Sequence, residues 1–421
     1  MLKDSRLLKL RPSPWTLWGL AALGLLLAPW VWTSQFSHSL LSQMGIAILA
    51  CLSYNVLLGQ GGMLSFGHAV YTGLGAYMAM HALQAVSAGT LPLPVSLLPL
   101  VGAVAGMGFA ALLGWVTTRK AGTPFAMITL GMGELVGALA LMFPGFFGGE
   151  AGVSGNRVVG APWMGISFGP QIQVYYLIAA YTLAGGGALY AFTRTPLGRL
   201  LNAVRDNPER VEFLGFNPQR VRYFAFIIAG FFAGLAGGLA ALHFEIVTPE
   251  VVGAARSGGY LLFTFLGGAG FFAGPILGGV LMVLAQVLLS ALTQAWLLYL
   301  GLVFVFMVMV VPGGLASLIV DPLRLARSGP GDQRARIGAM ATRYLGLGLT
   351  AAVALAGAAA MVEMVYHRQL NAALGDQVRY LGLLLDSRSL DSWVGSALVM
   401  LTGLGLFELM RRHGPEWEAD A

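Results

Sequence analysis

Long uncharged segments alternate along this chain with short basic segments. No Asp, Glu, Lys or Arg lies between Arg11 and Arg119, and none lies between Arg256 and Asp321. A surface that faces water cannot be built from such segments, whereas a helix of about 20 apolar residues spans a bilayer. The pattern therefore predicts an all-α membrane protein, a polytopic bundle of about ten core transmembrane helices plus two C-terminal helices.

Charges in the loops indicate the side of the membrane on which each span ends. Arginine excess marks the cytoplasmic side, so the basic N-terminus, Arg119-Lys120 and the basic segment 321–343 are all expected there. Apolar length and an even number of spans between these points then predict ten core spans. They lie at roughly 15–32, 40–58, 63–84, 93–117, 124–143, 172–192 and 223–242, with three short spans sharing 257–311.

This pattern divides the chain into four parts. They are an N-terminal cytoplasmic segment with the first span (1–39), a transmembrane core (40–320) with the cytoplasmic loop 194–222, a cytoplasmic linker (321–343), and a C-terminal extension (344–421) with spans near 344–366 and 393–410. The first apolar segment is long, contains Pro29, and is followed by no small-residue cleavage site. An uncleaved first span is therefore preferred to a secretory signal.

Composition and missing motifs exclude several classes of function. Hydrophobic residues make up 57% of the chain and charged residues 10%, which is far from a soluble domain. The net charge of +6 comes from the loops, so no nucleic-acid partner is expected. The sequence has no G-x-x-x-x-G-K-[ST] motif, no cluster with metal-ligand spacing, and no set of nucleophile, base and acid. We therefore expect a transporter subunit rather than an enzyme, with no catalytic residue, metal or cofactor of its own.

An arginine-rich loop at 195–222 is the longest polar interruption in the first three quarters of the chain. Its first part predicts a short helix with one apolar stripe, formed by Leu197, Leu200, Leu201 and Val204. Asn207-Pro208 predicts an N-cap and a first helical residue, and Gly215 stands where a helix C-terminus favours a left-handed residue. A structured helix pair between spans favours docking on a soluble partner. A solvated positive-inside loop is the alternative.

Residues 59–77, GQGGMLSFGHAVYTGLGAY, form a glycine-dense block with polar side chains at membrane depth. Irregular segments in transporters line cavities, because only protein or water can satisfy their backbone groups. His68 is a candidate for contact with a solute, and a histidine hydrogen-bonded between helices is the alternative. The sequence leaves open whether this block spans the membrane or re-enters it.

Glu134 is the only Asp, Glu, Lys or Arg in the fifth predicted span. Intramembrane carboxylates usually face a bundle interior or a cavity, so Glu134 is a candidate for the translocation path, and a structural hydrogen bond is the alternative. His243 and Glu245 are expected to be exposed at the outer end of the seventh span. The segment AGFFAG occurs from Ala229 and again from Ala269, and each copy opens a glycine ladder that predicts close helix packing.

Three segments together resemble the permease of branched-chain amino-acid ABC importers, of the M-subunit type. They are the glycine block, the loop TPLGRLLNAVRDNPERVEFLGFNPQRVR and the later segment GGAGFFAGPILGGVL. The resemblance covers roughly 44–321 and leaves out the two C-terminal spans. It implies a second homologous permease, two cytoplasmic ATPase subunits that use the ATP, and a periplasmic binding protein that delivers Leu, Ile or Val. It also implies the bacterial inner membrane and an alternating-access path between the two permeases.

In that family the arginine-rich loop is the coupling helix, which enters a groove on the ATPase. The coupling residues that the resemblance implies here are Leu197, Gly198, Arg199, Arg205, Asp206, Asn207, Pro208, Glu209 and Gly215. The expected translocation path combines the glycine block with the carboxylate of the fifth span, and includes Gln60, Gly62, Ser65, His68, Tyr71 and Glu134.

Other solutes and another mode of transport stay open. The permease for urea, short amides or other amino acids in the same importer type looks similar, and amino-acid groups are recognised largely by a separate binding protein. An ATP-independent channel or facilitator is the alternative from a different class. Uptake without any ATPase subunit would favour that channel.

Overall fold

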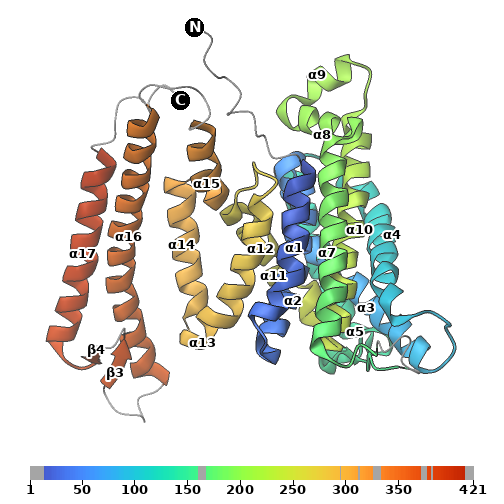
Figure 1. Cartoon of the computed structure of the whole chain (residues 1–421), viewed down its shortest axis with the longest axis horizontal. Coiled ribbons are helices and arrows are strands. Elements are labelled where there is room, and N and C mark those ends of the chain that lie inside the picture. Colours follow the sequence, from blue (N-terminus) through green and yellow to red (C-terminus); the bar gives the residue numbers. More distant parts are fainter. Residues whose placement is uncertain are drawn as a thin grey trace, which may run out of the picture. The chain divides into compact units, whose positions relative to one another are not determined.

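The computed structural model describes residues 14–159, 167–293, 295–311, 313–325, 333–370, 377–380 and 383–412. The chain forms two compact units, Met1–Val283 and Leu284–Ala421, and each is described here by itself. Both units are predominantly helical (Figure 1).

The described part of the first unit contains twelve helices, most of which are labelled in Figure 1. They are α1 (Pro14–Val31), α2 (Gln35–Asn55), α3 (His68–Ser87), α4 (Leu98–Thr117), α5 (Thr123–Met142), α6 (Pro144–Phe147), α7 (Gln171–Arg194), α8 (Pro196–Asp206), α9 (Pro208–Phe213), α10 (Pro218–Phe244), α11 (Ala254–Gly267) and α12 (Gly274–Leu284). A π-helix, Val56–Gln60, continues α2, and short 3-10 turns lie at Val95–Leu97, Gly149–Ala151 and Pro249–Val252. Strands β1 (Val153–Ser154) and β2 (Ile246–Val247) pair antiparallel, with Val153 opposite Val247.

Helix α10 lies at the centre of the first unit, where it packs against α2, α3 and α4. A Cβ atom on Gly234 would lie 2.3 Å from the carbonyl oxygen of Gly102, and one on Gly106 would lie 2.4 Å from that of Gly230. Small residues permit this approach, and helix association in lipid depends on such close packing. The glycine ladder predicted from the AGFFAG segment at Ala229 is confirmed.

The third predicted span begins later than expected. The apolar pattern predicts this span at 63–84, whereas residues 61–67 are not helical and α3 begins at His68. Gly62 has φ +62°, a conformation that glycine adopts without a Cβ penalty. The glycine block therefore joins the π-helical end of α2 to α3 through an irregular and largely buried segment.

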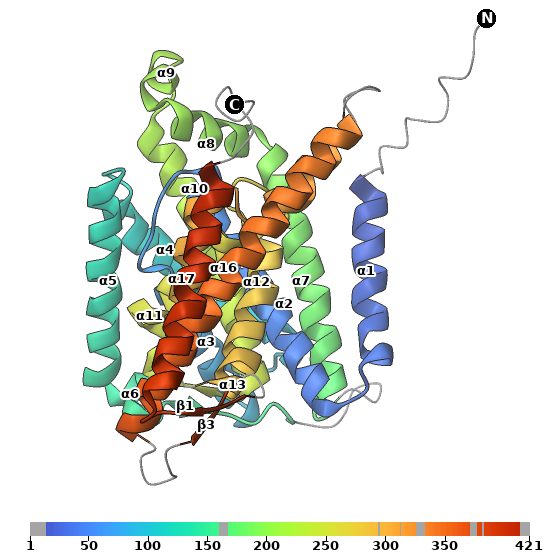
Figure 2. The same cartoon turned by 90° about the vertical axis from the view of Figure 1, so that its left-hand side faces the viewer.

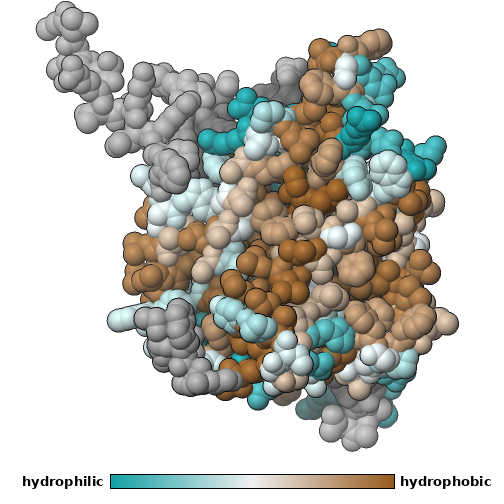
Figure 3. All heavy atoms as spheres, turned by 90° about the vertical axis from the view of Figure 1, so that its right-hand side faces the viewer, coloured by the Kyte–Doolittle hydropathy of each residue, from teal (hydrophilic) through white to brown (hydrophobic). Residues whose placement is uncertain are grey.

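Among the residues that the structure describes, seven helical segments are long and apolar enough to cross a membrane, namely Gln35–Gln60, Val95–Thr117, Thr123–Met142, Gln171–Arg194, Pro218–Phe244, Gly346–Gln369 and Leu390–Arg412. Shorter apolar helices lie at Trp18–Val31, Gly274–Leu289 and Trp296–Val310. Each overlaps a predicted span, and the two remaining predicted spans correspond to α3 and α11. On the face drawn in Figure 3, hydrophobic residues cover most of the middle. The all-α, multi-pass fold class is confirmed, and the exact number of spans stays a prediction.

The second unit consists of a π-helix (Ala285–Leu289), α13 (Ser290–Leu292), α14 (Trp296–Val310), α15 (Gly314–Leu325), α16 (Gln333–Leu370), β3 (Gln377–Tyr380), β4 (Leu383–Asp386) and α17 (Leu390–Arg412). Helices α16 and α17 meet where a Cβ atom on Gly403 would lie 2.4 Å from the backbone nitrogen of Ala354. Strands β3 and β4 form an antiparallel hairpin with Gln377 opposite Asp386, where the sequence predicted only a loop. The four-part division expected from the sequence stays a prediction.

Candidate functional site

Helices α8 and α9 form an elbow between α7 and α10, and residues 195–216 are called the elbow below (Figures 1 and 2). The Thr195 hydroxyl accepts a hydrogen bond from the Gly198 N–H at 3.2 Å, and Asn207 Oδ1 accepts one from the Arg210 N–H at 2.9 Å. Each cap is followed by a proline at the start of its helix. Gly215, with φ +84°, follows α9. The predicted pair of helices and the predicted Asn207 cap are therefore present, and the structure adds a cap at Thr195.

The apolar side chains of the elbow point in two directions. Leu201 and Val204 are buried, as the predicted apolar stripe requires. Three large residues at and beyond the end of α9 are exposed instead, and are called the apolar tip: Phe213 (91%), Leu214 (67%) and Phe216 (52%). The apolar tip was not predicted from the sequence. The signal for it was the run FLGF inside a polar loop, where apolar residues beyond the helical stripe have no core to join.

Most of the predicted coupling residues are accessible. The exposed ones are Arg199, Arg205, Asp206, Asn207, Pro208, Glu209 and Gly215. Leu197 is half-buried, and Gly198 is buried where a Cβ atom would lie 2.3 Å from the Phe192 carbonyl oxygen. Their contact with an ATPase stays a prediction.

The elbow is bonded directly to the beginning of the glycine block. Asn202 Nδ2 donates a hydrogen bond to Gln60 Oε1 at 2.9 Å, and the Arg205 guanidinium donates one to the Gly59 carbonyl. A Cβ atom on Gly62 would lie 2.7 Å from Cγ of Arg205. Two sets of residues that the sequence assigned to separate roles, the path and the coupling loop, therefore meet in one place.

His68 lies deeper in the glycine block and is fully buried within this chain. Its Nε2 lies 2.9 Å from the Ser53 hydroxyl on α2, and the ring of Tyr54 packs edge-on against it at 5.1 Å between centroids. The Tyr54 hydroxyl donates to the Ser65 carbonyl at 2.9 Å, and Tyr71 is also buried. The structure thus contains the interhelical bond that was the alternative interpretation of His68. Its place on a translocation path stays a prediction.

Glu134 lies on the exposed face of α5. Thr129, Gly133 and Val136 occupy the buried face. Within the described part of the chain Glu134 makes no hydrogen bond, so the structural bond expected as the alternative is not observed there. Exposed residues follow helical spacing around it: Met127, Leu130, Gly131, Leu135, Ala138 and Leu141. This stripe is called the α5 face.

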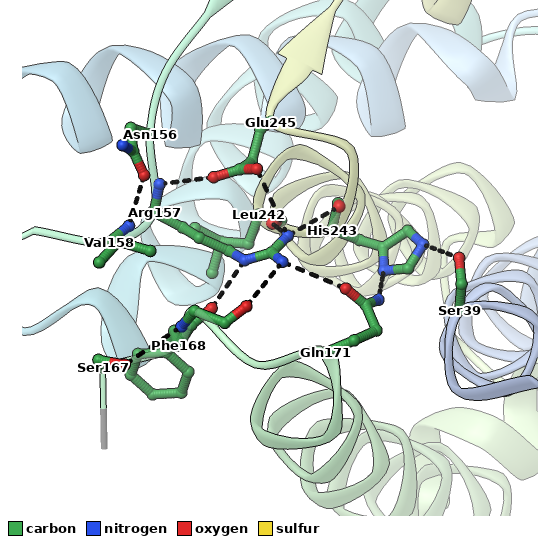
Figure 4. A network of polar contacts seen from close by, with 11 residues as sticks. Ser39, Asn156, Arg157, Val158, Ser167, Phe168, Gln171, Leu242, His243 and Glu245 are labelled. Atoms are coloured by element: carbon green, nitrogen blue, oxygen red, sulfur yellow. Dashed lines mark hydrogen bonds and ion pairs between the residues drawn. The ribbon is translucent and has the colours of Figure 1, made fainter. Parts of the chain in front are cut away.

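A second polar network lies at the opposite end of α7 and α10 from the elbow, around Arg157 (Figure 4). The side chain of Arg157 is nearly buried, and its five N–H groups all have acceptors, which is the full donor capacity of a guanidinium. The acceptors are the carbonyls of Phe168 (2.8 Å), Leu242 (3.2 Å), His243 (3.1 Å) and Gly169 (3.4 Å), and Gln171 Oε1 (3.2 Å). One side chain thereby ties the loop before α7 to the end of α10.

The expectation that His243 and Glu245 are simply exposed was wrong for His243. Its ring is buried, with Nδ1 3.0 Å from the Gln171 amide nitrogen and Nε2 3.3 Å from the Ser39 hydroxyl. Glu245 accepts a hydrogen bond from the Arg157 N–H at 2.8 Å and pairs with the guanidinium at 3.7 Å. The sequence showed these residues as span-end charges only, because their partners are some 70 to 200 positions away.

The second unit contains a polar cluster that the sequence analysis did not single out. Glu363 on α16 accepts hydrogen bonds from the hydroxyls of Tyr299, at 2.9 Å, and Thr293. Tyr380 on β3 donates to the Ala356 carbonyl at 3.2 Å, and burial, followed by the charge of Glu363, raises the pKa of Tyr380. Within the described residues no group of three or more His, Cys, Asp or Glu is placed to hold a metal ion.

Comparison with known proteins assigns the family. The family described as branched-chain amino acid transport system / permease component matches residues 36–312, more than half of the chain. The chain belongs to this permease family. The permease protein LivM of the high-affinity branched-chain amino acid transport system of Salmonella typhimurium is 30% identical over 314 residues, which cover 69% of this chain and 72% of LivM. LivM of Escherichia coli K12 is 30% identical over 302 residues (66% and 70%).

The permease also resembles the other permease protein of such systems. LivH of Salmonella typhimurium is 25% identical over 263 residues, covering 58% of this chain and 81% of LivH. No solved structure gave a significant match. The matched residues 36–312 include the elbow, the glycine block, the α5 face and the Arg157 network. Helices α16 and α17 and the β3–β4 hairpin lie beyond the match.

Proposed function

We propose that this permease is the transmembrane subunit of an ATP-driven importer of branched-chain amino acids, in the inner membrane of a bacterium with its N-terminus in the cytoplasm. The family match supports the substrate class, since the relatives are named for branched-chain amino acid transport. The observation that carries the coupled mechanism is the elbow, whose outer end is an apolar tip and whose inner side is bonded to the glycine block.

The apolar tip supports a protein partner at the elbow. Aromatic side chains that are exposed to solvent at the end of an ordered helix are typical centres of protein–protein contact. Arginine excess in the same loop favours the cytoplasmic side. Because the sequence has no phosphate-binding loop, the partner there is a pair of ATPase subunits that use ATP, and this permease needs no cofactor of its own. The end with the Arg157 network then faces the periplasm and the substrate-binding protein.

The α5 face supports a second permease as the other membrane partner. A carboxylate at the bilayer centre costs about 2.5–3.5 kcal/mol when a helix is inserted into lipid. Glu134 lies on a face that this chain leaves uncovered. Pairing with a homologous permease relieves that cost, and it places Glu134 beside a path between the two subunits.

Reconstitution tests the proposed function. The permease should copurify in mild detergent with a second permease and an ATPase, and proteoliposomes of that complex should take up leucine only with ATP and the binding protein present. Uptake by the permease without an ATPase would favour a channel. Uptake of urea or amides in place of leucine, with the same ATP requirement, would overturn the substrate and retain the importer.

Glu134→Gln tests the path. Since Glu134 is exposed and unpaired within the described chain, the neutral amide should leave the melting temperature in detergent unchanged. We expect ATP-dependent uptake to fall, because the charge that faces the path is lost. Glu150→Gln, the same change at an exposed carboxylate outside the α5 face, is the matched control and should leave uptake unchanged. Uptake equal to that of the unmodified permease would remove Glu134 from the path.

A further inference from the structure

The junction between the elbow and the glycine block has the geometry of a mechanical linkage. The π-helix Val56–Gln60 ends at this junction, and residues 61–67 are irregular. π-helical turns are rare and are found mostly at functional sites. Residues 59–62 are called the glycine turn below.

The glycine turn is held tightly on two sides. A Cβ atom on Gly59 would lie 2.2 Å from the carbonyl oxygen of Ala269, in the loop between α11 and α12. On the other side, a Cβ atom on Gly61 would lie 3.2 Å from a methyl of Leu201, and one on Gly62 would lie 2.7 Å from Arg205. Close-packed contacts transmit displacement instead of absorbing it. A shift of α8 therefore displaces the turn.

Two hydrogen bonds fix α8 to this turn. The Asn202 amide donates to the Gln60 side chain, and the Arg205 guanidinium donates to the Gly59 carbonyl. Carbonyls in the last turn of a helix lack intrahelical donors, so Arg205 supplies a bond that the end of the π-helix requires. The stem of Arg205 packs at the same time over Gly62. The family resemblance had implied that Arg205 contacts a partner, but within this chain its guanidinium already bonds inward to the Gly59 carbonyl and pairs with its exposed neighbour Asp206.

Several polar atoms around the glycine turn are buried without a partner in the described part of the chain. Among the described residues, Asn55 Oδ1, Ser65 Oγ and His68 Nδ1 are buried without a hydrogen-bond partner. Asn55 Oδ1 lies 2.3 Å from the Cβ position of Gly59. Buried polar atoms are nearly always bonded, so unbonded ones call for an explanation. Rewinding of the segment between α2 and α3 would change the surroundings of all three atoms.

We propose that Asn202 and Arg205 are positioning residues that carry the motion of the elbow into the glycine turn, and that they act separately from the apolar tip, which docks the partner. The proposal rests on the proposed function, because it describes how a movement that ATP drives in the partner would pass from the elbow to the transmembrane segments. The tip receives the force at Phe213, Leu214 and Phe216. The inner face of α8 passes it to the irregular segment that precedes α3.

The test uses the whole importer in proteoliposomes and compares two double variants. Asn202→Ala with Arg205→Ala should keep the ATPase bound in copurification and keep ATP hydrolysis, while substrate taken up per ATP falls about fivefold or more. Phe213→Ala with Phe216→Ala should instead lose the ATPase from the complex. Lys120→Ala, which removes an exposed charge elsewhere on the chain, is the control and should change neither quantity.

Rescue separates a positioning role from a general loss of structure. Asn202→Gln combined with Gln60→Asn exchanges the two amides, and should restore at least part of the uptake per ATP that Asn202→Ala loses. Arg205→Lys keeps one donor for the Gly59 carbonyl and should lie between the unmodified chain and Arg205→Ala. The melting temperature of each complex is measured alongside. If Arg205→Ala does not fold, the uptake per ATP of Arg205→Lys tests the role of Arg205 instead.

Two results would overturn the linkage. The first is unchanged uptake per ATP in the Asn202 and Arg205 double variant. The second is loss of the ATPase from that complex, which would show that these residues belong to the surface that binds the ATPase. Failure of the proposed function has a different signature, namely an unmodified complex that shows no ATP-dependent uptake.

Discussion

At the scale of single residues, Arg157 shows how a nearly buried charge is accommodated in this permease. Its guanidinium donates five hydrogen bonds to groups on the loop before α7, on α7 and at the end of α10. Glu245 supplies the opposite charge at 3.7 Å and also binds the Arg157 backbone. A buried charge is tolerated only when it is paired and fully hydrogen-bonded. Arg157 therefore acts by holding the loop before α7, the start of α7 and the end of α10 together.

Arg157→Lys is expected to destabilise the permease by about 2–4 kcal/mol, because an ammonium has three donors and no planar fork. The melting temperature in detergent should fall accordingly. Arg220→Ala, at an exposed arginine near the start of α10, should leave it unchanged. Equal melting temperatures for Arg157→Lys and the unmodified chain would show that the network adds no stability.

At the scale of elements, the packing of the first unit is set by pairs of glycines on facing helices. Gly234 on α10 meets Gly102 and Gly106 on α4, and the Cβ position of Gly75 on α3 lies 2.5 Å from the Cα of Gly234. Three helices therefore meet with their backbones almost in contact. Periodicity in the sequence indicated the ladder on α10, and only the structure identified the helices that it faces.

Gly234→Ala should separate these helices and cost about 1–3 kcal/mol, because the added methyl would have to occupy space taken by backbone atoms. Gly108→Ala on α4 is the matched control, since nothing lies within 4 Å of its Cβ position. Alanine there should be neutral or stabilise by up to about 1 kcal/mol through its helix propensity. Thermal unfolding in detergent compares the two, and an equal effect would contradict the close packing at Gly234.

At the scale of the whole molecule, the two compact units do not coincide with the family match. The match ends at residue 312 and the second unit begins at Leu284, so α14 belongs to the family region and also packs in the second unit. Glu363 joins the matched region to the C-terminal extension. Its partners Thr293 and Tyr299 lie within the match, whereas Glu363 itself lies on α16, outside the match. The C-terminal extension is therefore bonded to the last helices of the permease match.

Glu363→Ala should loosen this attachment by about 2 kcal/mol, because the Tyr299 and Thr293 hydroxyls lose their acceptor. Hydrogen exchange in α14 and α16 should rise, with exchange in α10 unchanged as the internal reference. Uptake per ATP should stay at the level of the unmodified importer, since no contact of the elbow or the glycine turn includes Glu363 within the described residues. Exchange that stays the same in α14 would show that the bond does not hold the extension.

Local patterns in the sequence were sufficient for the multi-pass helical fold, the two helices of the elbow and the Asn207 cap. Transfer of apolar residues into lipid and capping of helix ends depend on neighbours within a few positions. The same patterns did not reveal the Asn202–Gln60 bond, which joins residues 142 positions apart, or the acceptors of Arg157. They also did not decide which way Glu134 points. Those features depend on how helices distant in sequence pack against one another, and only the folded chain brings the groups together.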